Sequence, residues 1–314
     1  MPDIWTVLLV AILLLLFAVP IVRQQMTRVR RLQAIRDLEA ERRTRVILLI
    51  HRQEQIGFLG IPLFRYIDIN DSEEILRAIR LTEPEMPIDF IVHTPGGRIL
   101  SSEQIAMALR RHEGKVTVFV PHYAMSGGTL LCLAADEVAM DENAVLGPVD
   151  PRIGEYPAAS ILRVPRLKPP EEIEDETFIL VDIAAKAQNQ MREFVAGLLR
   201  DRMDAERADR LSRLLTEGTW THDYLITLEQ ARDLGFPVTP GMPAGIYRLM
   251  DLFPQAMPRP ARRSPTCRSP TGKRRRSDDV GETCFKDPAP GSLCSVRDTC
   301  SQSTRISPAV TPWS

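Results

Sequence analysis

Three short apolar runs, separated by stretches of helical character, constrain the fold of this chain more than any other feature. The runs span residues 46–50, 90–92 and 116–120, and turn-forming or charged residues bound each of them. Short apolar runs of this kind are typical of buried strands. The segments 72–81 and 99–112 between them have the character of helices. Strands that alternate with helices predict an α/β domain with a largely parallel sheet.

The chain begins with a long apolar segment. Residues 4–22 are almost entirely apolar, which is close to the roughly 20 residues that a helix needs to cross the hydrocarbon core of a bilayer. A cleaved signal peptide is the alternative, but no basic residue precedes the run and no small-x-small site follows it. We therefore expect an N-terminal transmembrane helix over residues 1–22, with the lipid bilayer as its partner.

The charges on the two sides of this segment predict its orientation. Only Asp3 carries a side-chain charge before the apolar run, whereas arginines are frequent directly after it. The positive-inside rule then places the rest of the chain in the cytosol. The sequence thus predicts a single-pass membrane protein with a cytoplasmic catalytic domain.

Composition divides the rest of the chain into three segments. Residues 23–44 are rich in Arg, Leu, Ala and Glu and contain no Gly or Pro, as a helical stalk would. Residues 45–253 carry the predicted strands and helices, including a long amphipathic helix over residues 177–200. Residues 254–314 are rich in Pro, Ser, Thr and Arg and have few large apolar side chains. We expect this tail to be disordered.

Charge and cysteine usage argue against several classes of function. The chain has 40 basic and 41 acidic side chains, so its overall charge does not favour nucleic acid as a partner. The five cysteines show no paired spacing of metal ligands, and four of them lie in the polar tail. We therefore expect no zinc site and no disulfide framework.

Two glycine-rich turns follow two of the predicted strands and carry the clearest chemical signal. The first is His-Thr-Pro-Gly-Gly at residues 93–97, and the second is Ala-Met-Ser-Gly-Gly at residues 124–128. Paired glycines let the backbone approach a substrate closely, and amides at the start of a helix favour an anion. In acyl transfer that anion is the tetrahedral oxyanion, and the hydroxyl of Ser126 would face the same point. Either turn alone is also explained by turn geometry, with Ser126 as a helix N-cap.

The segment that contains both turns resembles a known superfamily. Its Pro-Gly-Gly and Ala-Met-Ser-Gly-Gly turns, with the run AADEVAMDENAVLGPVDP after them, are similar to the Ser/Lys peptidases of the Clp and crotonase superfamily. The later segments GTWT, residues 218–221, and EQARDLG, residues 229–235, resemble the closing part of the serine dehydrogenase proteinase family, near signal peptide peptidase A. The resemblance covers residues 45–253.

The resemblance implies a spiral of strand-strand-helix units that assembles into a ring-like homo-oligomer. It implies Ser126 as the nucleophile, the amides of Gly97 and Gly127 as the oxyanion hole, and Gly96 as a point where an extended substrate docks. The expected reaction is peptide-bond hydrolysis through an acyl-enzyme on Ser126, and the resemblance implies no metal and no nucleotide cofactor. Polypeptides, in particular membrane-protein fragments or signal peptides, are the expected substrates.

The general base is the open part of this interpretation. A Clp-type triad would supply a histidine soon after the nucleophile, but no histidine lies between His122 and His222. A Ser/Lys dyad is the alternative, in which a desolvated lysine accepts the serine proton. Lys168 precedes the long helix, as the lysine does in the signal-peptide-peptidase relatives, and we favour it over Lys186 within that helix. We assign structural roles to the remaining candidates: His93, His112, His122, His222, Asp136, Asp141 and Asp150.

Two other functions are consistent with the same fold. The crotonase branch uses paired amides to stabilise the thioester enolates of acyl-CoA, but its sites need no serine at position 126. A non-catalytic membrane scaffold that has kept the fold is the second alternative, because fold does not imply function.

Overall fold

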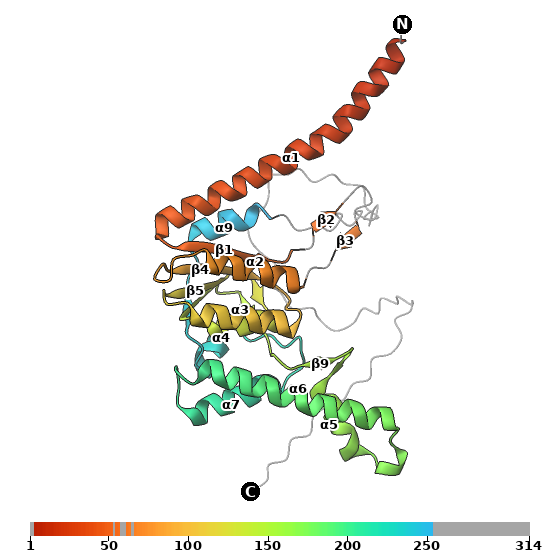
Figure 1. Cartoon of the computed structure of the whole chain (residues 1–314), viewed down its shortest axis with the longest axis vertical. Coiled ribbons are helices and arrows are strands. Elements are labelled where there is room, and N and C mark those ends of the chain that lie inside the picture. The colour runs from red at the N-terminus through yellow and green to blue at the C-terminus, as the bar shows by residue number, and fades with distance from the viewer. Residues whose placement is uncertain (1–2, 53, 57–60, 64–65, 254–314) are drawn as a thin grey trace, which may run out of the picture. The chain divides into compact units, whose positions relative to one another are not determined.

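A five-stranded sheet forms the core of the structure, a computed structural model that describes residues 3–52, 54–56, 61–63 and 66–253 (Figure 1). All neighbouring strands in this sheet are parallel. In spatial order the strands are β1 (Arg45–Ile50), β4 (Ile88–His93), β5 (Val116–Val120), β7 (Glu137–Met140) and β11 (Val238–Pro240). The three predicted strands correspond to β1, β4 and β5, and the prediction of an α/β domain with a largely parallel sheet is confirmed.

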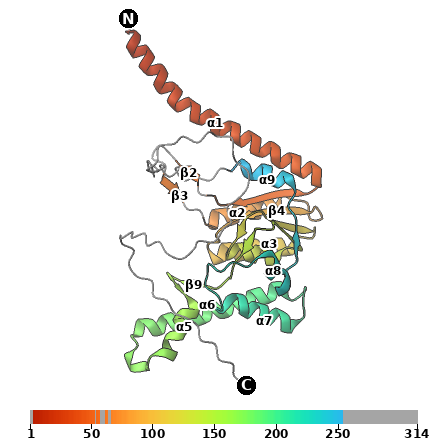
Figure 2. The ribbon, with the colours of Figure 1, turned by 180° about the vertical axis from the view of Figure 1, so that it is seen from behind.

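Helices cover both faces of the sheet (Figure 1). One face carries α2 (Ile69–Arg80), α3 (Ile99–Arg111) and α4 (Gly127–Ala134), and the other carries α9 (Ala244–Asp251) and the end of α1 (Ile4–Arg42). The view from behind shows the same order of layers (Figure 2). The two helices predicted over residues 72–81 and 99–112 correspond to α2 and α3.

Alternate residues of β4 and β5 point into the two helical layers. Phe90 and Val118 belong to the larger core, with the side chains of α3 and α4, whereas Ile91 and Phe119 pack in a second cluster with Leu249 of α9. Because both faces are buried, these strands read in the sequence as continuous apolar runs without alternation.

The remaining elements of the described residues are three short strand pairs and four further helices. The strand pairs are β2 (Glu54–Ile56) with β3 (Ile61–Leu63), β6 (Tyr123–Ala124) with β8 (Val145–Leu146), and β9 (Arg152–Ile153) with β10 (Tyr156–Pro157). The helices are α5 (Ala158–Leu167), α6 (Asp175–Leu199), α7 (Ala205–Thr216) and α8 (Leu228–Leu234), with a 3-10 turn at Pro170–Glu172. Helix α6 is the long helix predicted over residues 177–200.

The N-terminal apolar segment does not form an element of its own. It is the first part of α1, which continues without interruption through the arginine-rich segment to Arg42 and packs Leu38 against the sheet beside Val46 and Ile246. Among the residues that the structure describes, no helix combines the length and the apolar character that crossing a bilayer requires. This finding overturns the prediction of a transmembrane anchor over residues 1–22 and, with it, that of a single-pass membrane protein with a cytoplasmic catalytic domain. The predicted disordered tail, residues 254–314, lies outside the described residues.

Candidate active site

The two glycine-rich turns lie against each other at one edge of the sheet. They follow β4 and β5, which are adjacent parallel strands, so both turns leave the sheet at the same edge. The N–H of Thr94 donates to the carbonyl of Tyr123 at 3.2 Å, and the N–H of Met125 donates to the carbonyl of Thr94 at 3.0 Å. These two bonds connect the turns directly, beside Ser126.

Gly96 faces Ser126 at the closest approach of the two turns. Its φ is 104°, and a Cβ added to it would lie 2.8 Å from the Cβ of Ser126. Both facts exclude a side chain here, because positive φ favours glycine and the space is already filled. Gly96 is therefore required by the position of the serine, whereas a Cβ on Gly97 would lie 2.3 Å from the backbone of Ile67.

Ser126 itself has an unusual backbone conformation. Its φ of 49° and ψ of −113° lie outside the regions that L-residues ordinarily occupy. The residue precedes α4, whose side chains are all buried, but its hydroxyl makes no capping hydrogen bond to the helix. The alternative interpretation of Ser126 as a side-chain N-cap is therefore wrong, and the half-buried hydroxyl faces a cavity.

Two backbone amides beside Ser126 are available as donors. The N–H of Ile67 donates to the carbonyl of Gly96 and the N–H of Arg98 donates to the carbonyl of Ile67, both at 2.8 Å. In a parallel bridge this pattern turns the N–H of Gly97 away from Ile67. Gly127 is the first residue of α4, so its N–H has no acceptor within the helix. Over the described ranges, neither of these two amides donates a hydrogen bond within the protein.

A cavity of about 440 Å³ opens in front of the two turns. Gly97, Ser126 and Gly127 line one side of it. Its apolar lining comes from Ile99, Leu130, Val149 and Met191, and its charged or polar lining includes Asp150, Arg152, His222 and Asp223. The cavity thus places a hydroxyl, two glycines with available amides and an imidazole around one space.

The imidazole belongs to His222, which is paired with a buried aspartate. The distance between Nδ1 of His222 and Oδ1 of Asp150 is 2.8 Å. The side chain of Asp150 is 2% exposed and that of His222 is 22% exposed. A buried carboxylate that binds one ring nitrogen fixes the orientation of the ring and leaves the other nitrogen for chemistry in the cavity.

A short antiparallel contact brings these two residues together. The backbone groups of Leu146 and Ile226 exchange two hydrogen bonds, at 2.9 and 3.0 Å. Asp150 lies four residues after Leu146, and His222 lies four residues before Ile226, so the antiparallel approach sets the two opposite each other. The bond from the N–H of Val149 to the carbonyl of Leu215 holds the same segment from the other side.

The structure brings some of the predicted site residues together and leaves others apart. Ser126, Gly97 and Gly127 line the cavity, and Gly96 lies directly behind Ser126. Lys168 is exposed at the end of α5, and Lys186 forms an exposed ion pair with Asp182 one turn away, with Nζ 2.5 Å from Oδ2. Neither lysine lines the cavity that contains Ser126.

The other candidates weighed from the sequence also lie outside this cavity: His93, His112, His122, Asp136 and Asp141. Burial lowers the pKa of His93 to about 3, with smaller contributions from nearby charged groups, so this side chain is neutral at physiological pH. His112 contacts the carbonyl of Met86 through Nε2. The structural roles of these five residues stay predictions.

Sequence reasoning missed the functional potential of His222 and Asp150. The search for a base followed the order of residues along the chain, whereas triads are recognised by geometry and not by sequence position. One signal was present, because residues 217–223, EGTWTHD, form a largely polar stretch that contains His222, and functional residues are concentrated on polar loops.

The described residues offer no place for a metal ion. Over those ranges, no group of three or more His, Cys, Asp or Glu side chains is arranged to bind one. Cys132, the one cysteine that the structure describes, is fully buried in α4, and burial raises the pKa of its thiol. It therefore packs as a small apolar side chain.

Comparison with known proteins identifies the family. A profile described as "ClpP-like SDH-type serine proteinase" matches residues 1–278. This chain belongs to that family. It is a serine peptidase with a ClpP-like α/β fold, which agrees with the resemblance of the two glycine turns and disfavours both the acyl-CoA enzyme and the non-catalytic scaffold.

Two relatives of this ClpP-like proteinase come from Methanocaldococcus jannaschii. "Uncharacterized protein MJ1495" is 56% identical over 243 residues, which cover 77% of this chain and 83% of the relative. "Uncharacterized protein MJ0137" is 52% identical over 240 residues, which cover 76% of this chain and 84% of the relative.

Two solved structures are more distant. ClpP1 from Listeria monocytogenes is 13% identical with a TM-score of 0.40, and the match covers 63% of this chain and 92% of that one. A variant of the 1510-N membrane-bound stomatin-specific protease is 20% identical with a TM-score of 0.40, over 60% of this chain and 79% of that one. At these scores the two similarities carry no argument about the site.

Proposed function

We propose that this protein hydrolyses peptide bonds through an acyl-enzyme on Ser126, with His222 as the general base and Asp150 as its partner. The observation that carries the proposal is the 2.8 Å contact between Nδ1 of His222 and Oδ1 of Asp150 at the cavity that Ser126 also lines. Nucleophile, base and an orienting carboxylate around one cavity are the elements of serine hydrolase chemistry.

The aspartate determines which ring nitrogen of His222 acts. Since the carboxylate of Asp150 accepts a hydrogen bond, Nδ1 carries the proton, and the lone pair of a neutral His222 lies on Nε2. Nε2 then accepts the proton from Ser126, directly or after a small shift on substrate binding. The negative charge of Asp150 stabilises the imidazolium that forms.

The reaction proceeds in two balanced halves. The oxygen of Ser126 attacks the scissile carbonyl while its proton moves to Nε2 of His222, and collapse of the tetrahedral intermediate transfers that proton to the departing amine. Water then attacks the carbonyl of the acyl-enzyme and gives one proton to Nε2 of His222. Collapse of this second intermediate releases the carboxylic acid product, and the oxygen of Ser126 takes the proton back from His222. The protein regenerates its starting state after each cycle.

The amides of Gly97 and Gly127 are proposed to bind the oxyanion in both halves. Support comes from the available N–H groups of these residues and from their position at the cavity that Ser126 also lines. Removing one such preorganised donor typically lowers the rate by about 10²–10³. Gly96 contributes by its lack of a side chain, which lets an extended substrate approach the serine.

The apolar lining of the cavity suggests the type of substrate. Ile99, Leu130, Val149 and Met191 surround the space next to Ser126 and fit an apolar side chain of an extended polypeptide. Signal peptides and membrane-protein fragments would supply such side chains.

Exposed apolar side chains on α5 and α6 support the proposal of a homo-oligomer. Leu167, Phe178, Ile179 and Ile183 are all exposed in the single chain. A second copy that covers this surface would remove it from water. Sedimentation of the purified protein tests this part of the proposal, because a monomer at micromolar concentration contradicts it.

One set of variants tests the catalytic proposal against the Ser/Lys dyad. Turnover of casein or a fluorogenic peptide is measured for the wild type, Ser126→Ala, His222→Ala, Lys168→Ala and Lys186→Ala. We expect Ser126→Ala and His222→Ala each to lose about 10³-fold or more in kcat, and both lysine variants to stay within about twofold of the wild type.

The lysine variants are the matched controls in this experiment. Loss of turnover in one of them, with His222→Ala still active, contradicts the triad and establishes the dyad with that lysine as base. Labelling of Ser126 by a fluorophosphonate, followed by peptide mapping, identifies the nucleophile independently of the substrate chosen.

A further inference from the structure

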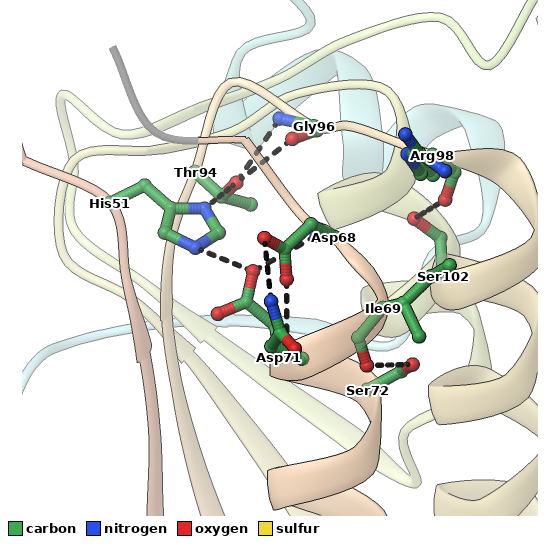
Figure 3. Close-up of polar contacts among 10 residues, drawn as sticks. His51, Asp68, Ile69, Asp71, Ser72, Thr94, Gly96, Arg98 and Ser102 are labelled. Carbon is green, nitrogen blue, oxygen red and sulfur yellow. Dashed lines mark hydrogen bonds and ion pairs between the residues drawn. The ribbon is translucent and has the colours of Figure 1, made fainter. Parts of the chain in front are cut away.

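His51 lies directly behind the first glycine turn, at the end of β1 (Figure 3). It is 5% exposed and does not line the cavity that contains Ser126. Its Nδ1 lies 2.8 Å from Oγ1 of Thr94, and its Nε2 lies 3.2 Å from Oδ2 of Asp71. The ring therefore connects a residue of the first glycine turn with the first turn of α2.

Thr94 relays this contact to the backbone of the turn. Its side chain is fully buried, and its Oγ1 accepts a hydrogen bond from the N–H of Gly96 at 3.1 Å. A carboxylate opposite Nε2 requires a proton on that nitrogen, so in a neutral His51 the hydroxyl of Thr94 donates to Nδ1. The lone pairs of Oγ1 then point away from the ring, where they accept from Gly96.

Asp71 connects the same histidine to Ile67, the residue whose backbone is bridged to Gly97. The N–H of Asp68 donates to Oδ2 of Asp71 at 2.9 Å, and the N–H of Asp71 donates to Oδ1 of Asp68 at 3.0 Å, which is a capping box at the start of α2. Ile67 directly precedes this box, and its backbone binds the carbonyl of Gly96 and the N–H of Arg98. His51 thus holds both segments whose hydrogen bonds set the direction of the Gly97 amide.

We propose that His51 is a positioning residue for peptide hydrolysis: through Thr94 and Asp71 it fixes the Gly97 amide in the orientation that binds the oxyanion. The inference rests on the proposed function of Gly97. A displacement of about 1 Å in such a group can lower the rate by as much as 10²-fold. A buried side chain that holds the turn in place therefore has a measurable effect on the rate. His51 acts on the transition state without touching the substrate.

Two substitutions separate the contact of His51 with Thr94 from its contact with Asp71. In His51→Asn the amide group replaces Nδ1 and retains the contact with Thr94, whereas in His51→Gln it reaches the position of Nε2 and retains the contact with Asp71. Thr94→Val removes the hydroxyl at nearly constant volume, and Thr94→Ser keeps it. Asp204→Ala is the matched stability control, because it removes an exposed N-cap of α7 and leaves the glycine turn unchanged.

The experiment measures kcat and KM with a fluorogenic peptide, the inhibition constant of a peptide boronate, and the thermal midpoint of each variant. A boronate forms a tetrahedral adduct on serine and reports on the oxyanion hole. We expect His51→Gln and Thr94→Val to lose about tenfold to a hundredfold in kcat and similarly in boronate affinity, with KM within about twofold. His51→Asn loses the contact with Asp71 and should also fall, by about tenfold in kcat, whereas Thr94→Ser keeps the hydroxyl and should stay within about threefold of the wild type.

The outcomes distinguish this inference from the proposed function. Wild-type kcat and boronate affinity in His51→Gln or Thr94→Val, beside an active wild type, overturn the role of His51 alone. Equal losses in Asp204→Ala at the same thermal midpoint assign the effect to stability and also overturn it. Absence of Ser126-dependent hydrolysis in the wild type overturns the proposed function and the inference that rests on it.

Discussion

His222 and Asp150 are 72 residues apart in the chain, yet Nδ1 of the histidine lies 2.8 Å from Oδ1 of the aspartate. The carboxylate is buried and the imidazole is partly exposed at the cavity. An aspartate in this position holds the tautomer with the proton on Nδ1, so its charge and its acceptor atom both matter. Replacement by the isosteric amide separates these properties from packing.

We expect Asp150→Asn to lower kcat about 10³–10⁴-fold near neutral pH, because the amide can donate to Nδ1 and stabilise the wrong tautomer. The thermal midpoint should change little, since Asn fills the same volume. The measurement is steady-state peptide hydrolysis together with thermal unfolding. Asp223→Asn, which alters a second acidic residue at the same cavity, is the control. Turnover above a tenth of the wild-type value in Asp150→Asn contradicts the role of Asp150.

The contact between Gly96 and Ser126 gives a second prediction. Gly96→Ala places a methyl group 2.8 Å from the Cβ of Ser126 in a residue with φ of 104°, so the turn must shift and the serine with it. We expect a loss of about 10²-fold or more in kcat. Kinetic measurements on the folded variant, verified by circular dichroism, check this result.

Gly154→Ala is the matched control for this substitution. Gly154 also has a positive φ, 61°, but an added Cβ would meet nothing within 4 Å. It therefore carries backbone strain of about 1 kcal/mol without any contact at the site. If Gly154→Ala loses as much activity as Gly96→Ala, strain alone explains the loss and the contact with Ser126 has no special role.

The sequence predicted the sheet and the nucleophile turn because both depend on local patterns. The strands are buried on both faces, so consecutive residues such as Phe90 and Ile91 are both apolar and the strands appear as continuous apolar runs. Gly96 is required by its positive φ and by its contact with Ser126, and the other glycines of the two turns leave no room for a Cβ. Such requirements are visible in the residue type alone.

Prediction of the general base and of the N-terminal helix requires contacts between distant parts of the chain, which no local sequence pattern contains. His222 reaches Asp150 only because Leu146 and Ile226 form a backbone bridge between distant segments. The position of Lys168 before the long helix favours it in the sequence, but in the structure that position is on the surface. The apolar N-terminal run was interpreted by itself, whereas in the structure it belongs to a helix that continues to Arg42.

Substitution of Gly197 by alanine is expected to raise the stability of the fold without affecting the candidate active site. It lies in α6, is exposed, and has open space where a Cβ would be added. Gly197→Ala should raise the free energy of unfolding by roughly 0.5–1 kcal/mol, because alanine loses less backbone entropy in a helix. Chemical denaturation measures this change, with peptide hydrolysis as the check on function. A lower midpoint of unfolding in Gly197→Ala contradicts the helical assignment of this position.

The burial of His93 determines how the free energy of unfolding is expected to change in acid. Its ring nitrogens are buried and make no hydrogen bond within the part of the chain that the structure describes, and burial lowers its pKa from an ordinary value of 6.5 to about 3. The charged groups near it are His51, Arg52 and His122, all of which lower this pKa further. The folded protein therefore holds His93 neutral at a pH where the unfolded chain protonates it.

The sign of the effect follows from proton binding. Between pH 6.5 and 3 the unfolded state binds one proton more than the folded state at this residue, so the contribution of neutral His93 is complete above pH 6.5 and is lost as the pH falls. We expect His93→Phe to remove that slope, on the order of a few kcal/mol over the whole window. Urea denaturation at pH 7, 6 and 5 measures it for the wild type and the variant. An unchanged difference in stability between wild type and His93→Phe across these pH values would show that His93 is not the group that titrates.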